Sequence, residues 1–276
     1  MTPFWGKGYS DGDIRAFLDG ESVRHEQLDD DRLFDRTVEA LTEGKVIGWF
    51  QERFEWGPRA LGHRSILADP RRADMKEIVN TKIKFREPYR PFAPSVLNDR
   101  VHEYFDAPGV ERQYPARFML LVADVRPSKY DVIPAVTHVD GTGRLQTVLR
   151  EGNSRYYDLI ERFGQVTGVP VVLNTSFNLR GEPIVGSPRE AYSTFMRSEM
   201  DTLVLGNYVV EKTGDLMPKS IRAAGRRVGI MRELLGFLWA QKLWWLMPMV
   251  LVLLVLGILL VFAQSSAIAP FIYTLF

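Results

Sequence analysis

The chain has 276 residues, 46% of them hydrophobic, which is enough for one sizeable folded domain and a smaller appendage. Its formal net charge of +1 gives no reason to expect a nucleic-acid partner. The chain contains no cysteine, which excludes disulfides, thiolate zinc sites and cysteine nucleophiles. Its four histidines lack the short spacing of a metal-binding pair, so we expect no transition-metal site.

The polarity pattern predicts an α/β fold in which a mixed, twisted sheet is flanked by helices. Residues 1–30 are polar, and we expect them to be irregular. Helices are expected at residues 31–42, 72–83, 155–163 and 188–196. Strands are expected at residues 45–50, 64–69, 91–97, 118–125, 145–149, 169–173 and 202–205.

The C-terminal region differs from the rest of the chain, because residues 243–276 contain no charged residue. Residues 243–263 have the length of a helix that spans a membrane. Tryptophans lie at the N-terminal edge of this run, and basic residues precede it but do not follow it. A buried core helix is the alternative, but it would need a partner layer that the short tail does not supply.

From this pattern we expect three parts, with the sheet domain in residues 1–215, a basic linker in residues 216–236 and a single-pass transmembrane region in residues 237–276. The positive-inside rule then places residues 1–242 in the cytoplasm.

The region between Glu52 and Pro94 carries more cations than an ordinary loop region. They are Arg59 and Arg64 in a turn with glycine and proline, then Lys84, Arg86 and Arg90. The acidic residues nearby cannot each pair with one of these cations. Forked guanidinium groups bind phosphate oxygens well, and these cations alternate with glycine, proline and aromatic residues. We therefore predict a shaped phosphate or polyphosphate pocket, with a solvated basic face as the alternative.

Two further polar segments could converge on the same site. Arg144 and Gln146 follow an Asp-Gly turn and lie on the same face of a strand. Asn174, Ser176 and Asn178 lie in a polar loop at the carboxyl end of an apolar strand, where open α/β sheets bind ligands. Taken alone, each segment is more typical of a turn or a cap. Ser176 has no histidine base at a recognisable spacing, so we do not interpret it as a nucleophile.

These motifs resemble those of a known family. Lys84-x-Arg86 followed by Arg90, and Ser176-x-Asn178, look like the Lys-x-Arg and Ser-x-Asn signature of YrdC-like domains, which bind ATP and form acyl-adenylates. Longer strings resemble more closely the C-terminal domain of the O-carbamoyltransferases, which include nodulation-factor and nebramycin carbamoyltransferases. These strings are residues 56–70, 84–94, 137–148 and 173–183. The last fifty or so residues resemble a family of small, uncharacterised one-pass membrane proteins.

The resemblance implies a YrdC-like fold for residues 1–215 and a two-step reaction. Carbamoyl phosphate and ATP, with Mg²⁺ brought by ATP, would give carbamoyl-adenylate and pyrophosphate. A metal-binding domain, which comes first in the family and is not found in this chain, would then transfer the carbamoyl group to a hydroxyl acceptor. We expect that domain to be supplied by a separate partner.

The resemblance also implies roles for the polar residues. Catalytic roles fall to Lys84, Arg86, Arg144 and Ser176. Substrate-binding roles fall to Arg59, Arg64, Lys84, Arg86, Arg90, Arg144, Asn174, Ser176 and Asn178. In this scheme the cations hold the polyanionic substrates, the hydroxyl and amide groups orient them, and no covalent enzyme intermediate is needed. His63 and His138 are expected to be structural.

Two other functions remain open. One is a non-catalytic nucleotide-binding or scaffold subunit of a carbamoyltransferase complex, although a scaffold has no need of unpaired arginines. The other is a YrdC-type enzyme that makes threonylcarbamoyl-adenylate for tRNA modification. The Gly-Pro-Arg-Ala-Leu-Gly string at residues 57–62 and the nearly neutral net charge weigh against it.

Overall fold

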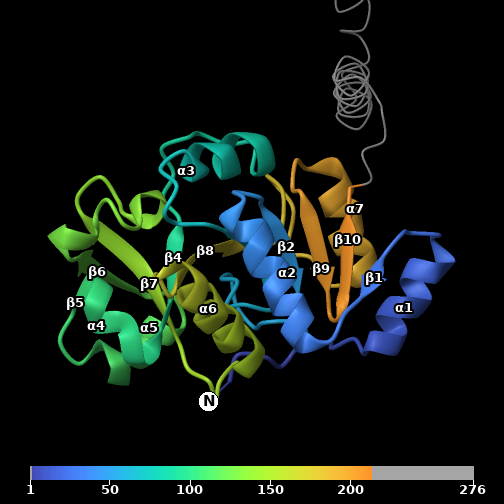
Figure 1. Cartoon of the computed structure of the whole chain (residues 1–276), viewed down its shortest axis with the longest axis horizontal. Coiled ribbons are helices and arrows are strands. Elements are labelled where there is room, and N and C mark those ends of the chain that lie inside the picture. The colour runs from blue at the N-terminus through green and yellow to red at the C-terminus, as the bar shows by residue number, and fades with distance from the viewer. Residues whose placement is uncertain (1, 213–276) are drawn as a thin grey trace, which may run out of the picture. The chain divides into compact units, whose positions relative to one another are not determined.

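Figure 1 shows the computed structural model of the chain, in which residues 2–212 are described. The strands are β1 (Glu26–Gln27), β2 (Ile47–Phe50), β3 (Arg64–Ala68), β4 (Ala93–Leu97), β5 (Phe105–Asp106), β6 (Leu121–Val125), β7 (Thr142–Val148), β8 (Val171–Ser176), β9 (Thr202–Leu205) and β10 (Tyr208–Glu211). They form one sheet in the order β1-β10-β9-β2-β3-β8-β4-β7-β6-β5. The β2–β9 and β4–β7 pairs are parallel and the other pairs are antiparallel. The prediction of an α/β fold with a mixed sheet is confirmed.

The flanking helices begin where short polar side chains can accept the first free backbone N–H groups. Asp29, Asn153 and Ser187 do so for α2 (Asp30–Thr42), α6 (Ser154–Thr167) and α7 (Pro188–Arg197). The helices are α1 (Asp11–Gly20), α2 (Asp30–Thr42), α3 (Met75–Ile78), α4 (Val101–Tyr104), α5 (Tyr114–Arg117), α6 (Ser154–Thr167) and α7 (Pro188–Arg197). The helix expected at residues 72–83 is present in part, because α3 continues as a π-helix at Val79–Ile83.

The expectation that residues 1–30 are irregular is wrong, because they include α1 and β1. Ser10 Oγ accepts from the backbone N–H of Asp13, and the Asp13 carboxylate accepts from the N–H of Ser10 at 2.9 Å. This reciprocal pair is a capping box, a recognisable helix-start signal. Ile14 and Leu18 are then buried on one face of the helix.

One face of the sheet is covered by α2 and α6 (Figure 1). Trp49 of β2, Val172 of β8 and Phe163 of α6 are fully buried in this layer. The two helices are also joined at the surface, where Arg162 lies 2.5 Å from Asp35. An exposed pair of this kind adds little stability, so the apolar layer holds the helices in place.

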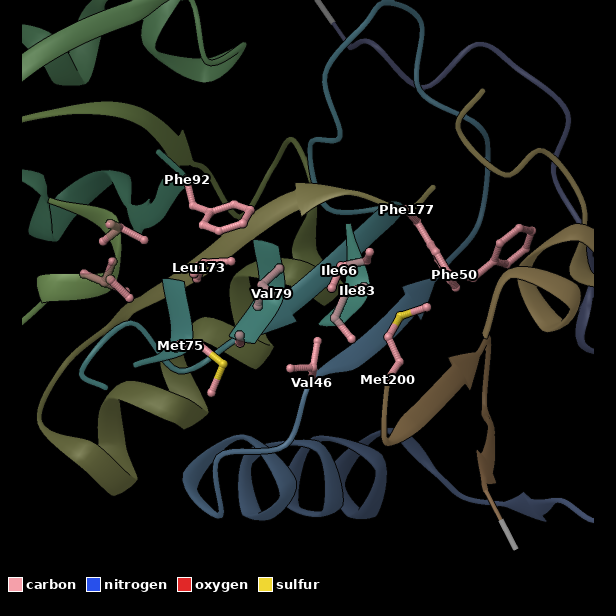
Figure 2. Packing of buried hydrophobic residues seen from close by; sticks show 14 of the residues in the cluster. Val46, Phe50, Ile66, Met75, Val79, Ile83, Phe92, Leu173, Phe177 and Met200 are labelled. Atoms are coloured by element: carbon pink, nitrogen blue, oxygen red, sulfur yellow. The ribbon is translucent and has the colours of Figure 1, made fainter. Parts of the chain in front are cut away.

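The opposite face holds the larger apolar cluster, part of which is drawn in Figure 2. Val79 and Ile83 of the π-helix are fully buried there, together with Ile66 of β3 and Leu173 of β8. Truncating a side chain as buried as Ile83 to alanine should cost about 2–5 kcal/mol of stability. This packing fixes the end of the π-helix against the sheet, directly before Lys84.

The register places several polar residues on the face that α6 covers. Ser95 of β4 lies opposite Gln146 of β7, and Arg144 lies opposite Val122 of β6. Alternate residues of a strand share a face, so Arg144 and Gln146 lie on the same side as Val148, which packs in the α2–α6 layer. The prediction that Arg144 and Gln146 share a face is confirmed.

Within residues 2–212, no helix combines the length and the apolar character that a membrane crossing requires. The expected linker at residues 216–236 and the expected transmembrane region at residues 237–276 lie outside the described residues.

Candidate functional site

The Lys84 ammonium group joins two motifs that lie far apart in the sequence. Its Nζ atom donates to the backbone oxygens of Ser176 and Asn178, and to Asn178 Oδ1 at 2.8 Å. It also lies 3.3 Å from Ser176 Oγ, which in turn donates to Asn178 Oδ1 at 2.7 Å. Burial lowers the pKa of Lys84 from 10.5 to about 7, and the positive charge of Arg86 adds to this lowering. A buried ammonium with only neutral oxygens around it is suited to receive an anion.

Four arginines extend this positive charge, and we call Arg59, Lys84, Arg86, Arg90 and Arg144 the cation group. Burial lowers the pKa of Arg86, and the charges of Arg90 and Arg144 lower it further, against a raising effect of Glu87. Burial also lowers the pKa of Arg144, with a further contribution from Arg59. Each guanidinium is therefore close enough to another to be repelled by it. The structure brings these five sequence-predicted residues together.

Most of the cation group has no carboxylate partner. Within residues 2–212, Arg59, Arg86 and Arg144 form no ion pair, whereas Arg90 pairs with Glu87 at 2.9 Å. The Nε atoms of Arg59 and Arg144 are buried and lack a hydrogen-bond partner among the described residues. Unpaired, partly buried guanidinium groups are costly in the absence of a ligand, so this arrangement favours an anion-binding site.

The loop that carries Arg59 is shaped by a buried carboxylate. Glu55 Oε1 accepts hydrogen bonds from the backbone N–H groups of Leu61 at 2.9 Å, His63 at 2.6 Å and Arg64 at 3.0 Å. Burial raises the pKa of Glu55, against the lowering effect of these bonds. Glu55 therefore folds the loop but does not neutralise Arg59.

Asn174 supports the loop that carries Arg59. Its Nδ2 atom donates to the backbone oxygen of Ala60 at 3.1 Å and to Gln146 Oε1 at 2.9 Å. Gln146 Nε2 donates to the backbone oxygen of Leu61 at 2.9 Å, and Ser95 Oγ donates to Gln146 Oε1 at 2.6 Å. Asn174 is buried and bonds to the backbone of the loop that carries Arg59, so the structure gives it a supporting position.

Arg64 is not brought into the cation group. It is fully buried, and its Nη atoms donate to the backbone oxygens of Gln51, Glu52 and His63. Its guanidinium lies 3.6 Å from the ring centroid of Phe50, and burial lowers its pKa to about 10. These contacts hold residues 50–55 in place, and we leave Arg64 out of the proposed site.

The two histidines near the site also make structural contacts. His63 Nδ1 lies 2.7 Å from the backbone oxygen of Arg53, and its ring stacks on Phe4 at 3.6 Å. Burial lowers the pKa of His63 to about 4, so it is neutral at pH 7. His138 Nδ1 lies 3.0 Å from Thr142 Oγ1. Among residues 2–212, no three acidic or histidine side chains are placed to hold a metal ion.

Sequence reasoning missed two residues that organise the site, Glu55 and Asn80. Asn80 Oδ1 accepts from Arg86 Nε at 2.7 Å. The available signals were a carboxylate just before a Gly/Pro turn and an asparagine beside the apolar stripe of a helix. Both patterns suggest buried polar groups that hold a loop.

Comparisons with known proteins match two parts of the chain. Residues 38–212 match the family described as "Carbamoyltransferase C-terminus", and residues 228–276 match a family of unknown function, DUF5989. The chain is 44% identical to the uncharacterized protein sll1178 of Synechocystis over 76% of this chain and 37% of that protein. It is 50% identical to nodulation protein NolNO of Sinorhizobium fredii over 70% of this chain and 28% of that protein.

A third relative, 3'-hydroxymethylcephem-O-carbamoyltransferase of Amycolatopsis lactamdurans, is 38% identical over 67% of this chain and 35% of that enzyme. The chain thus spans about a third of the length of these curated relatives. A solved structure of full-length HypF in a phosphate- and nucleotide-bound form aligns with a TM-score of 0.46 and 16% identity, over 64% of this chain and 25% of that one. At that score the likeness carries no argument. The match of residues 38–212 takes in more than half of the sequence, and the chain therefore belongs to the family described as "Carbamoyltransferase C-terminus".

Proposed function

We propose that the YrdC-like domain of this chain forms carbamoyl-adenylate from carbamoyl phosphate and ATP. Carbamoyl phosphate, water and ATP would give carbamoyl-adenylate, phosphate and pyrophosphate. Hydrolysis of carbamoyl phosphate breaks the bond between its phosphorus and the carbamate oxygen and releases phosphate. A carbamate oxygen then bonds to the α-phosphorus of ATP as the bond from that phosphorus to the pyrophosphate oxygen breaks. The observation that carries the proposal is the cation group, which is partly buried and largely without carboxylate partners in the described residues.

The cation group suits this reaction because both substrates are polyanions. Lys84, Arg86 and Arg90 would hold the phosphates of ATP and carbamoyl phosphate and stabilise the charge that develops on the leaving pyrophosphate. Arg59 and Arg144 would bind the carbamoyl phosphate side. Magnesium would arrive with ATP and offset part of its charge.

Ser176 and Asn178 would orient the small carbamoyl group or a phosphate by hydrogen bonding. Both side chains already contact the Lys84 ammonium group near the end of β8, so they need little rearrangement to meet a ligand there. Ser176 Oγ donates to Asn178 Oδ1, which agrees with an orienting role and no covalent intermediate.

The test is the exchange of labelled pyrophosphate into ATP by the purified chain. We expect exchange that depends on carbamoyl phosphate and is lost in Lys84→Ala. If a folded sample shows no exchange above the Lys84→Ala control but still binds ATP, the non-catalytic scaffold is the better function. Exchange that depends on threonine and bicarbonate instead would indicate the threonylcarbamoyl-adenylate synthase.

Transfer to a hydroxyl acceptor is a second part of the proposal. The relative from Amycolatopsis is named for carbamoylation of a hydroxymethyl group, and it is about three times as long as its match to this chain. We propose that a metal-binding transfer domain, as a separate domain or subunit, completes the reaction. Adding the purified partner to an exchange-competent chain should then consume carbamoyl-adenylate in an acceptor-dependent way.

We also propose that the chain is anchored by a single transmembrane helix at residues 243–263, with residues 1–242 in the cytoplasm. The support is the charge-free run, its tryptophan edge and the basic residues upstream of it. ATP and carbamoyl phosphate are cytoplasmic metabolites, which agrees with this orientation. A reporter fused after Phe276 should be active only outside the cytoplasm. Cytoplasmic activity, or full release of the chain by a high-salt wash, would contradict the assignment.

A further inference from the structure

Asn80 lies inside the π-helix that precedes Lys84 and is fully buried. In this segment the Lys84 N–H donates to the backbone oxygen of Val79 at 2.9 Å, which is the five-residue hydrogen bond of a π-helix. Short π-helical segments are frequent at functional sites, and this one ends at the buried lysine. An asparagine in this position needs partners for three polar groups, namely two N–H donors and one oxygen.

All three polar groups of Asn80 are used on the loop that follows Lys84. Its Nδ2 atom donates to the backbone oxygens of Pro88 at 3.1 Å and Arg90 at 2.9 Å, and its Oδ1 atom accepts from Arg86 Nε at 2.7 Å. The Asn80 backbone oxygen also accepts from the Arg86 N–H at 3.0 Å. These partners fix the orientation of the amide, because a flipped amide would set a donor against Arg86 and an acceptor against two carbonyls.

The loop has few other connections to the rest of the fold. Phe85 has a φ of +48°, a left-handed conformation that a non-glycine residue keeps only when its surroundings hold it. The Arg90–Glu87 pair lies within the loop itself. Arg180 reaches the backbone oxygen of Phe85 at a distance of 3.4 Å. Asn80 therefore supplies the principal buried anchor of residues 85–90.

The same contacts set the direction of the Arg86 side chain. Arg86 Nε is occupied by Asn80, and its guanidinium carbon lies 5.0 Å from the Phe92 ring centroid. Among residues 2–212, the Nη atoms of Arg86 have no hydrogen-bond partner. Asn80 thus orients Arg86 while leaving its terminal donors available, and because an amide is neutral it leaves the positive charge intact.

We propose that Asn80 is a positioning residue for oligophosphate binding, which holds Arg86 and the backbone of Pro88–Arg90 in the geometry that binds the ligand. This inference rests on the proposed function only in taking the cation group as the phosphate site. It does not require adenylate chemistry. Inorganic pyrophosphate is therefore a sufficient probe.

The experiment measures the dissociation constant of pyrophosphate by calorimetry for the full chain and its variants. We expect Asn80→Ala to weaken binding by about tenfold or more, and Asn80→Asp to weaken it at least as much. Asn80→Asp has the same shape, but it pairs its charge with Arg86 and places an oxygen against the Pro88 and Arg90 carbonyls. If Asn80→Ala fails to fold, Asn80→Asp carries the test.

The matched control is Asn207→Ala, in the turn between β9 and β10. Asn207 also accepts from an arginine, Arg155, at 2.7 Å, and its Nδ2 atom donates to the backbone oxygen of Leu28 at 3.0 Å. This control should lower the melting temperature but leave the dissociation constant within about twofold. A general loss of stability therefore cannot imitate the expected result.

A double-mutant cycle with Arg86→Ala separates positioning from packing. In the Arg86→Ala background, Asn80→Ala should change the dissociation constant by less than about threefold, because Arg86 is gone and only the effect through the Pro88–Arg90 backbone remains. The inference would be overturned if folded Asn80→Ala and Asn80→Asp bind pyrophosphate as tightly as the wild-type chain. It would also be overturned if Asn80→Ala changes the dissociation constant by the same factor in the wild-type and Arg86→Ala backgrounds. Pyrophosphate binding that keeps this coupling, in a chain that does not exchange pyrophosphate into ATP, would instead count against the proposed chemistry alone.

Discussion

Binding of an oligophosphate should be coupled to the uptake of a proton by Lys84. Burial lowers the pKa of this lysine from 10.5 to about 7. A lowering of this size corresponds to about 5 kcal/mol in favour of the neutral form. The oxygens of Ser176 and Asn178 around Nζ favour the charged form, so this energy is an upper bound. A phosphate placed beside Nζ adds a negative charge and raises the pKa again.

The sign of the pH dependence follows from this change. The bound state holds more protons than the unbound state at any pH between the two pKa values, so affinity must fall as pH rises. At roughly pH 8, about nine-tenths of Lys84 is neutral in the unliganded chain, and binding should take up nearly one proton. At roughly pH 6 the uptake should be near one-tenth of a proton. Affinity should fall by up to about tenfold per pH unit above pH 7.

Calorimetry of pyrophosphate binding in buffers with different ionisation enthalpies measures this uptake directly. Pyrophosphate itself titrates, so the control is Lys84→Met, which has similar length and no titrating group. The difference in uptake between the wild-type chain and Lys84→Met isolates the lysine. Equal proton uptake by the two proteins at pH 8, with both folded, would refute the reasoning.

Three further predictions follow from the contacts around the site. Arg59→Ala and Arg144→Ala should each weaken carbamoyl phosphate binding by about 1.5–3 kcal/mol, measured by calorimetry, without lowering the melting temperature. A large drop in the melting temperature with unchanged affinity would instead show that the arginine has a structural role. Arg64→Met should lower the free energy of unfolding in urea by about 2–4 kcal/mol, because three backbone oxygens lose their donor, and unchanged stability would contradict a structural role for Arg64. Glu55→Ala should also destabilise the chain, by about 2–4 kcal/mol, and Glu55→Gln should do so less, because the amide oxygen still accepts from the loop. If the two Glu55 substitutions lower the free energy of unfolding equally in the same urea experiment, the hydrogen bonds that Glu55 accepts are not the source of its stabilising effect.

The part of the fold that depends on local polarity could be predicted. The first half of β8 and most of β9 are apolar runs, and α6 has a clear apolar stripe. The π-helix could not be predicted, because nothing local distinguishes Val79–Ile83 from an ordinary helical turn. The π-helix occurs where Val79 and Ile83 pack into the apolar cluster and Asn80 donates hydrogen bonds to the next loop, and these contacts are not local in sequence.

The chemical type of the site could be predicted, but the direction of its side chains could not. The pattern identified Lys84, Ser176 and Asn178 as candidates for one site, and the fold brings them into contact. Arg64 stands in the same Gly/Pro-rich string as Arg59, yet its guanidinium is fully buried against backbone oxygens. The difference depends on the pairing of β3 with β2 and β8, which the local sequence does not specify.

The groups that support the cation group explain how so many positive charges can be held together without being neutralised. Asn80 holds Arg86, and Asn174 and Gln146 hold the backbone of the loop that carries Arg59. All three are neutral amides, which can donate and accept hydrogen bonds but cannot form an ion pair. The buried carboxylate nearby, Glu55, directs its bonded oxygen to backbone N–H groups. A carboxylate at position 80 would pair with Arg86 and compete with the ligand for its charge, and a carboxylate in place of Asn174 or Gln146 could not donate to the backbone oxygens of the loop. The choice of amides therefore leaves the repulsion among the cations to be relieved by the bound anion.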